Sequence, residues 1–148
     1  MKFHELTAGL VLEAGPRAIN EQEIVEFARR YDPQPFHIDP AAAAASRWGG
    51  LIASGWMTCS VAMQLAVSCA LIDSNSIGSP GVERLEWLHP VRPGDQLSLT
   101  MTVLESRVSS AGKVGVVRWQ WELRNQVSAV VLRMIATSLF ELVAGTEN

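Results

Sequence analysis

Cysteine, histidine and positive charge are all scarce in this chain. Its 148 residues include 2 cysteines and 3 histidines, and the formal net charge at pH 7 is -3. His4, His37 and His89 share no close spacing with Cys59 or Cys69, so we expect no bound metal. Because there is neither a basic stripe nor a positive net charge, we also expect no binding to nucleic acid.

The chain lacks an internal repeat, a low-complexity linker and a block of like charge. Its first ten residues, MKFHELTAGL, contain no long apolar core, so we see no secretory leader and expect a cytoplasmic protein with reduced thiols. Hydrophobic residues make up 48% and charged residues 18% of the chain, which is typical of a globular protein. We predict a single domain that spans residues 1–148.

One stretch without charged residues, from Leu51 to Ile72, is long enough to cross a bilayer. It contains several serines together with threonine, glutamine and glycine, and no cluster of positive residues flanks it. An apolar helix can also be the buried centre of a soluble protein. We therefore expect no contact with a membrane and predict a buried helix from about Ser54 to Ile72.

The first third of the chain indicates helices. Asn20 followed by Glu23 is typical of a capping box, and the helix that it begins should end before Pro33. Asp39–Pro40 should begin a second, short helix, which Gly49–Gly50 would end.

The second half indicates antiparallel strands, because apolar and polar residues alternate there with a period of two. The segments are 97–103, 117–123 and 130–136, and an earlier strand is expected at 82–88. Together these elements predict an α+β fold in which one antiparallel sheet wraps around the long helix.

The segment from Tyr31 to Asp39 carries the chemistry. Pro33 and Pro35 stiffen a short loop that presents Asp32 and His37. Histidine titrates near neutral pH, and a carboxylate can orient an imidazole or a water molecule, so a stiff loop with both groups suits acid–base catalysis. On spacing alone, a turn-forming aspartate and a packing histidine explain the two residues better.

A wider pattern favours catalysis. The segment from Phe27 to Met57 resembles the MaoC-like dehydratases, also called the (R)-specific enoyl-CoA hydratase or hydratase-2 family. The family motif, roughly Gly-Asp-x-Asn-Pro-Leu-His-x-Asp, corresponds here to Tyr31 through Asp39. A glycine-bearing helix start follows at Ala53-Ser54-Gly55-Trp56-Met57, and His89-Pro90-Val91-Arg92-Pro93-Gly94-Asp95 is similar to the family's strand–turn segment. The resemblance extends from about Glu5 to Leu142.

The resemblance implies a hot-dog fold and the syn addition of water to a trans-2-enoyl thioester, or the reverse dehydration. It assigns Asp32 and His37 to holding and activating the water and to handling the proton. It assigns the Gly55 N–H to polarising the thioester carbonyl, which agrees with the free N–H groups and the dipole at a helix start. It also implies a homodimer or larger homo-oligomer, with acyl-CoA or an acyl carrier thioester as substrate and no further cofactor. We predict substrate contacts from residues that flank these groups: Gln34, Phe36, Ser54 and Trp56.

Two residues depart from the family motif and leave alternatives open. Tyr31 replaces glycine and Gln34 replaces asparagine, which puts the rate and the substrate in doubt. One alternative is a hot-dog thioesterase, but many of those resemble one another in an acidic residue on the central helix, and none lies between Leu51 and Ile72. The other is an acyl-CoA-binding subunit without catalytic activity.

Overall fold

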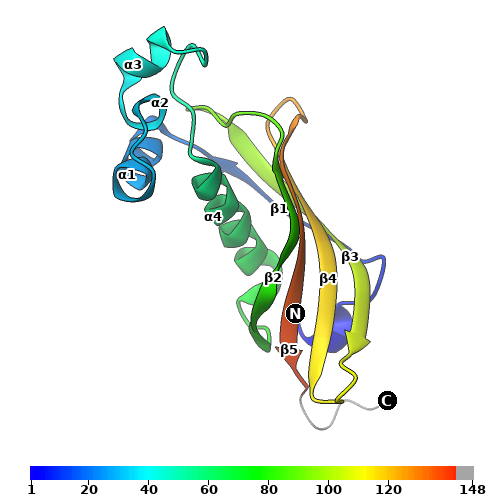
Figure 1. Cartoon of the computed structure of the whole chain (residues 1–148). Helices are drawn as coiled ribbons and strands as arrows, with labels where there is room; N and C mark the ends of the chain where they lie inside the picture. The colour runs from blue at the N-terminus through cyan, green and yellow to red at the C-terminus, as the bar shows by residue number, and fades with distance from the viewer. Residues whose placement is uncertain (143–148) are drawn as a thin grey trace.

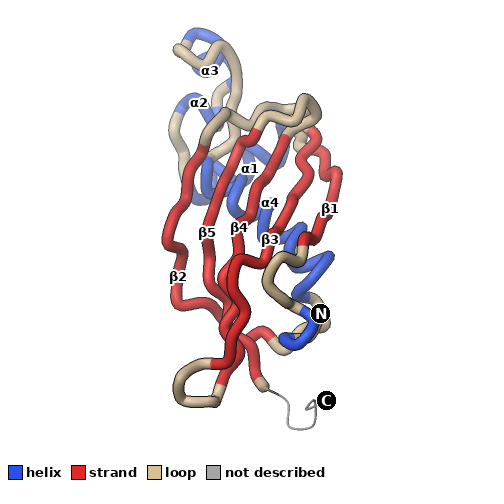
Figure 2. Tube along the Cα trace, turned by 90° about the vertical axis from the view of Figure 1, so that its right-hand side faces the viewer, coloured by secondary structure: helices blue, strands red, loops and turns tan. Residues whose placement is uncertain are grey.

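A five-stranded antiparallel sheet forms the body of the protein. The computed structural model describes residues 1–142. The strands lie in the spatial order β1-β3-β4-β5-β2, and every neighbouring pair is antiparallel (Figure 2). Their bounds are β1 Val11–Ala18, β2 Ser76–Trp87, β3 Gln96–Val108, β4 Val114–Arg124 and β5 Val130–Glu141.

One helix, α4, lies along a face of this sheet, and the other α-helices gather near the end at which α4 begins (Figure 1). The sheet and this helix confirm the predicted α+β architecture. The bounds are η1 Phe3–Glu5, α1 Glu21–Tyr31, α2 Pro35–Ile38, α3 Pro40–Ala45, α4 Gly55–Ala66 and a π-helical continuation, η2, over Val67–Leu71.

The core lies between α4 and the sheet. Along β4, residues alternate strictly between buried and half-buried, and Trp119 and Trp121 are among the largest fully buried side chains. They face the apolar stripe of α4, in which Met57, Val61 and Leu65 are all buried as the sequence predicted. The period-two pattern therefore identified the inner face of the strands correctly.

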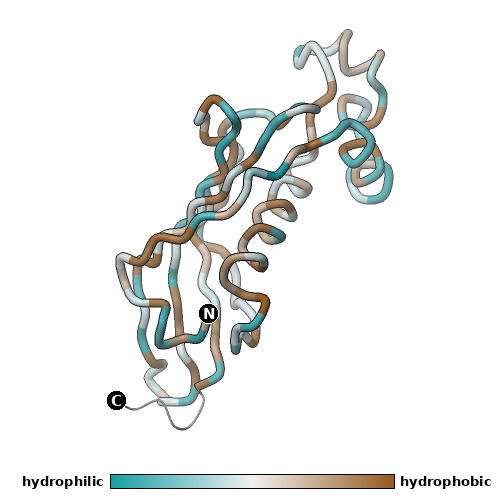
Figure 3. Tube along the Cα trace, turned by 180° about the vertical axis from the view of Figure 1, so that it is seen from behind, coloured by the Kyte–Doolittle hydropathy of each residue, from teal (hydrophilic) through white to brown (hydrophobic). Residues whose placement is uncertain are grey.

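The opposite face of α4 is open in the single chain. Trp56 is 57% exposed and Met63 is 48% exposed, while Val67 is also exposed. Figure 3 shows apolar positions in brown at intervals along the whole length of the helix. The expectation of a helix buried on all sides is thus met on one face only, and a further apolar surface is left uncovered.

Several element boundaries differ from the sequence-based expectation. The strand β1 was missed because it is an edge strand whose pairing with β3 is interrupted between Ala14 and Arg17, where Gly15 and Pro16 lie. The alternation of apolar and polar residues along β1 is therefore weak. The regular part of α4 stops at Ala66, and the predicted turns up to Ile72 are π-helical instead.

The short helix α3 also ends earlier than predicted. Its end is at Ala45, and Ser46 is its C-cap, so Gly49–Gly50 lies in the following loop and does not terminate the helix. The capping box at the start of α1 is confirmed, because Asn20 and Glu23 each accept a backbone hydrogen bond from the other.

Candidate active site

Two helix boundaries position Asp32 and His37. The Asp32 N–H donates to the Ala28 carbonyl oxygen at 2.8 Å, which closes α1. Pro33 and Pro35 then restrict the backbone, and Pro35 begins the one-turn helix α2, in which His37 lies. The stiff loop predicted from the sequence is therefore partly helical, and this turn directs the imidazole back toward the carboxylate.

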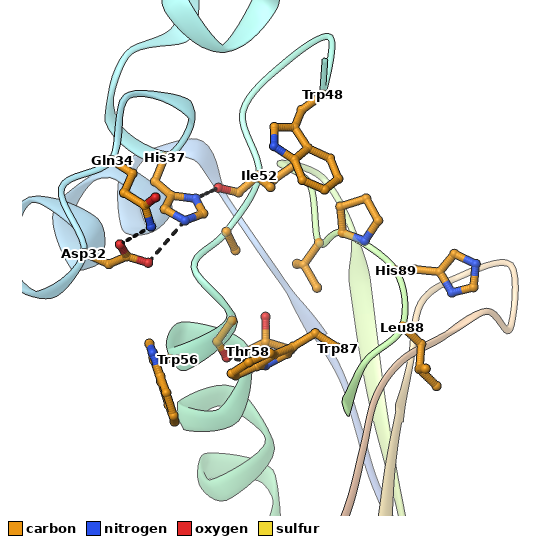
Figure 4. A pocket seen from close by; sticks show the side chains of 14 residues that line it. Asp32, Gln34, His37, Trp48, Ile52, Trp56, Thr58, Trp87, Leu88 and His89 are labelled. Carbon is orange, nitrogen blue, oxygen red and sulfur yellow. Dashed lines mark hydrogen bonds and ion pairs between the residues drawn. The ribbon is translucent and has the colours of Figure 1, made fainter. Parts of the chain in front are cut away.

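Besides their contact with each other, three groups hold the two side chains in place, and Figure 4 shows two of them, Gln34 and Ile52. His37 Nε2 lies 3.2 Å from Asp32 Oδ2, which also accepts a hydrogen bond from the Ser54 hydroxyl at 2.7 Å. Asp32 Oδ1 accepts one from the Gln34 side-chain amide at 2.7 Å. On the other side of the imidazole, Nδ1 lies 2.6 Å from the Ile52 carbonyl oxygen. Since His37 is only 4% exposed, its ring has a single available orientation.

These contacts determine where the protons lie. A carbonyl oxygen only accepts, so His37 Nδ1 carries a proton and donates it to Ile52. Burial raises the pKa of the Asp32 carboxyl, but the hydrogen bonds from Gln34 and Ser54 and the neighbouring His37 outweigh burial and hold that pKa below its ordinary value. Asp32 is therefore a carboxylate at neutral pH, and its Oδ2 can accept a hydrogen bond.

Helix α4 begins beside this pair. Its N-cap is Ser54, whose Oγ accepts a hydrogen bond from the Trp56 N–H at 3.3 Å while its hydroxyl donates to Asp32. The first N–H groups of a helix have no carbonyl partner within the helix, and the helix dipole favours negative charge there. Gly55, the first helical residue, lines the pocket and so offers such an N–H near the carboxylate.

The indole of Trp87, at the end of β2, covers the same helix start. Its Nε1–H donates to the Gly55 carbonyl oxygen at 2.9 Å. Its ring lies edge-on to that of Trp56, with the ring centroids 5.2 Å apart. A Cβ added at Gly55 would lie 2.5 Å from Trp87 Cε2, so the indole rests directly on the glycine backbone.

A cavity of about 370 Å³ opens beside the pair and the helix start. That volume is within the range of small-molecule sites, and most of the wall is apolar with a few polar groups, as such sites require. The residues that line it are Asp32, Gln34, His37, Trp48, Ile52, Ala53, Gly55, Trp56, Thr58, Trp87, Leu88, His89, Pro90 and Val91.

Comparison with known proteins identifies the family. A model of the MaoC-like domain matches residues 5–122. The chain belongs to this family. The solved structure of the MaoC-like dehydratase from Rhodospirillum rubrum is 35% identical, with a TM-score of 0.87 over 96% of this chain and 97% of that one. The unliganded R-hydratase PhaJ1 from Pseudomonas aeruginosa is 25% identical, with a TM-score of 0.77 over 99% and 94% of the two chains. The uncharacterized protein YdeM of Bacillus subtilis is 29% identical over 107 residues, which are 72% of this chain and 76% of that protein.

Family membership confirms the resemblance noted in the sequence and, with the structural neighbours, the predicted hot-dog fold. In this MaoC-like domain, Gln34 and Trp56 reach the cavity, as do the three residues predicted to be catalytic. Phe36 and Ser54 do not line it. Phe36 packs edge-on against the His37 ring at 4.5 Å, and Ser54 is fully buried behind Asp32. Their contacts are thus with the Asp32–His37 pair, which suits holding it in place better than touching a substrate.

Tyr31, which departs from the family motif, points away from the cavity. Its side chain is 63% exposed and packs on Phe27, with the ring centroids 5.1 Å apart. It therefore lies on the outer surface of α1 and does not line the pocket. No sequence pattern indicates the Ile52 carbonyl as the partner of His37, because that contact depends on the path of the loop before α4.

Among residues 1–142, no three His, Cys, Asp or Glu side chains are grouped as metal ligands would be. Over the same range, no helix has both the length and the apolar character that a bilayer crossing requires.

Proposed function

We propose that this MaoC-like protein is a hydro-lyase that adds water to a 2-enoyl thioester or removes water from a 3-hydroxyacyl thioester. The observation that carries the proposal is the Asp32–His37 pair, fixed by hydrogen bonds at the edge of an apolar cavity and beside a helix start. Membership of the family and the similarity to an R-hydratase support hydratase or dehydratase chemistry in general.

The geometry suits hydration in the following way. The thioester carbonyl accepts a hydrogen bond from the Gly55 N–H, which stabilises the negative charge that develops on its oxygen. The Asp32 carboxylate takes a proton from a water molecule as the water oxygen bonds to C3. The imidazole of His37 gives its Nε2 proton to C2, and the proton on Asp32 then returns to Nε2. Both groups act from one side, so the addition is syn.

This reaction consumes only water and the thioester, so we propose no cofactor other than the coenzyme A or acyl carrier that bears the acyl group. Gln34 and Trp56 are proposed to contact the substrate from opposite walls of the cavity. Cys59 and Cys69 are both free thiols, which agrees with the cytoplasmic location that we propose.

The test is hydration of crotonyl-CoA, followed by the loss of absorbance of the conjugated enoyl group. Positioned acid–base groups contribute about 10²–10⁴-fold each, so Asp32→Asn and His37→Ala should each lower kcat/KM by about that factor. His4→Ala and Asp73→Asn, which change the same residue types outside the cavity, are the matched controls. A wild-type protein that hydrates no enoyl thioester, including longer and branched ones, would contradict the proposal.

Two other functions give different results in the same assay. A thioesterase would release free thiol from acyl-CoA, whereas a binding subunit would retain affinity for acyl-CoA without turnover. The absence of Asp and Glu between Leu51 and Ile72 argues against the thioesterase. The complete set of hydrogen bonds around Asp32 argues against a subunit that has lost its chemistry.

We also propose that the protein is a homodimer. Strand β2 is an edge strand of twelve residues with nearly all of its residues exposed, and such edges pair readily with another strand. It carries the exposed apolar residues Ile77 and Val82, and Met63 of α4 and Val67 of η2 are exposed as well. A second copy related by a two-fold axis would cover both surfaces at once. Light scattering that shows a stable monomer at micromolar concentration would refute this.

A further inference from the structure

Three tryptophans line the cavity, and Trp87 differs from the other two in what it contacts. Trp48 packs against Phe36 on one wall, with ring centroids 6.5 Å apart. Trp87 comes from the sheet and reaches across to α4, where its indole N–H is bonded to the Gly55 carbonyl oxygen. Figure 4 shows the Trp56 and Trp87 rings at the end of the cavity opposite to the Asp32–His37 pair.

The space on the helix side of this indole is formed by small residues. Gly55 has no side chain, and a Cβ there would be 2.5 to 2.8 Å from three atoms of the indole. One turn further along α4 lies the Cys59 thiol, whose pKa is raised by burial and lowered in smaller part by the neighbouring Trp87 indole. Thr58 lines the cavity beside it. The indole therefore occupies a gap that the helix itself would leave open.

We propose that Trp87 is the residue that limits acyl-chain length, and that the substrates are short-chain acyl thioesters of about four carbons. This inference rests on the proposed function, which places the thioester carbonyl at Gly55 and C3 near Asp32. An acyl chain that continues beyond C3 toward α4 then meets the two indoles, Trp56 and Trp87, which line that part of the cavity. Extension along α4 toward Cys59 is blocked by the Trp87 ring.

The experiment compares crotonyl-CoA with 2-octenoyl-CoA in the wild-type protein and in Trp87→Ala. The wild type should have the higher kcat/KM for crotonyl-CoA. In Trp87→Ala the ratio of kcat/KM for octenoyl to crotonyl should rise by about tenfold or more, because a single methylene in an apolar pocket already changes this quantity by about 10–200-fold. Trp87→Phe retains a ring and should keep a ratio close to that of the wild type.

Trp48→Ala is the matched control, because it removes an indole from the same cavity without opening the gap beside Gly55. It should change kcat/KM for both substrates by similar factors. Calorimetric binding of butyryl-CoA and octanoyl-CoA gives a second reading that needs no turnover, and the Kd ratio should shift in the same direction in Trp87→Ala. Circular dichroism establishes that each variant is folded.

The outcomes separate the two proposals. A wild type that hydrates no thioester contradicts the proposed function. The ratio of the Kd values for butyryl-CoA and octanoyl-CoA then tests, without turnover, whether Trp87 limits chain length. A wild type that prefers octenoyl-CoA overturns the inference while leaving the hydro-lyase intact. So does an unchanged ratio in folded Trp87→Ala, or an equal shift in Trp48→Ala. Failure to bind either acyl-CoA overturns both.

Discussion

A methyl group added at Gly55 should destabilise this protein, although alanine is a better helix former than glycine. Gly55 is not among the glycines with positive φ, so its backbone conformation suits alanine. In open space, Gly55→Ala would stabilise the folded state by about 0.4–1 kcal/mol. Here the new Cβ would lie 2.5 Å from Trp87 Cε2 and 2.7 Å from Nε1, so the ring or the helix has to move. Overpacking of this kind costs about 1–3 kcal/mol.

Whether Gly55→Ala lowers or raises the free energy of unfolding should therefore depend on residue 87. In the wild-type background, Gly55→Ala should lower the free energy of unfolding by about 1–3 kcal/mol. In a Trp87→Ala background the obstacle is gone, and the same change should be neutral or stabilising. The coupling free energy between the two positions should then be at least about 1 kcal/mol, which is the smallest sum of the two effects.

Urea unfolding followed by circular dichroism measures this cycle, with the total protein concentration fixed because association also affects the midpoint. Gly50→Ala is the control: its Cβ would meet only Arg92 Nη1, at an ordinary 3.5 Å. That variant should change stability by less than about 0.5 kcal/mol. If Gly55→Ala has the same effect with and without Trp87, the indole does not rest on the glycine and the reasoning fails.

Three further predictions concern the pair and the open surface. The proposed mechanism uses Asp32 and His37 as a unit, so the variant that combines Asp32→Asn with His37→Ala should lose little more activity than the worse single variant. Multiplicative losses would contradict this. Ser54→Ala removes a hydrogen-bond donor that holds the Asp32 pKa low, so the acid limb of the pH profile of kcat/KM should move to higher pH. Ser54→Thr keeps the hydroxyl and should leave the profile in place. An identical shift in Ser54→Thr would refute the role of this hydroxyl in lowering the Asp32 pKa. Val82→Lys should convert the homodimer to monomer in light scattering, whereas an intact dimer would show that the β2 edge is not the interface.

Local signals in the sequence account for what was predicted correctly. The capping box at Asn20 depends on residues three positions apart, and the alternation along β4 reports directly on which face is buried. Asp32 and His37 were proposed as a pair because Pro33 and Pro35 restrict the loop between them and because the segment resembles the family motif, and the structure brings the two side chains together. Each of these features is encoded within one short segment.

The same local patterns could not predict contacts between segments that are distant in the sequence. The meeting of Trp87 with Gly55 depends on how β2 pairs with β5, and that register shifts three times along the strand. The substrate contacts predicted for Phe36 and Ser54 assumed that residues next to a catalytic group also face the cavity. In the structure, α2 and the N-cap of α4 turn these two side chains toward the pair itself.

Ser54 joins the two parts of the proposed mechanism. Its oxygen accepts the Trp56 N–H and thereby sets the first turn of α4, while its hydrogen is donated to the carboxylate of Asp32. The N–H proposed to bind the thioester oxygen belongs to the next residue, Gly55. Because this one hydroxyl bonds to both elements, it ties the position of the proposed oxyanion donor to that of the Asp32 carboxylate, which is proposed to activate water. A single buried hydroxyl can in this way preserve the alignment on which the proposed reaction depends.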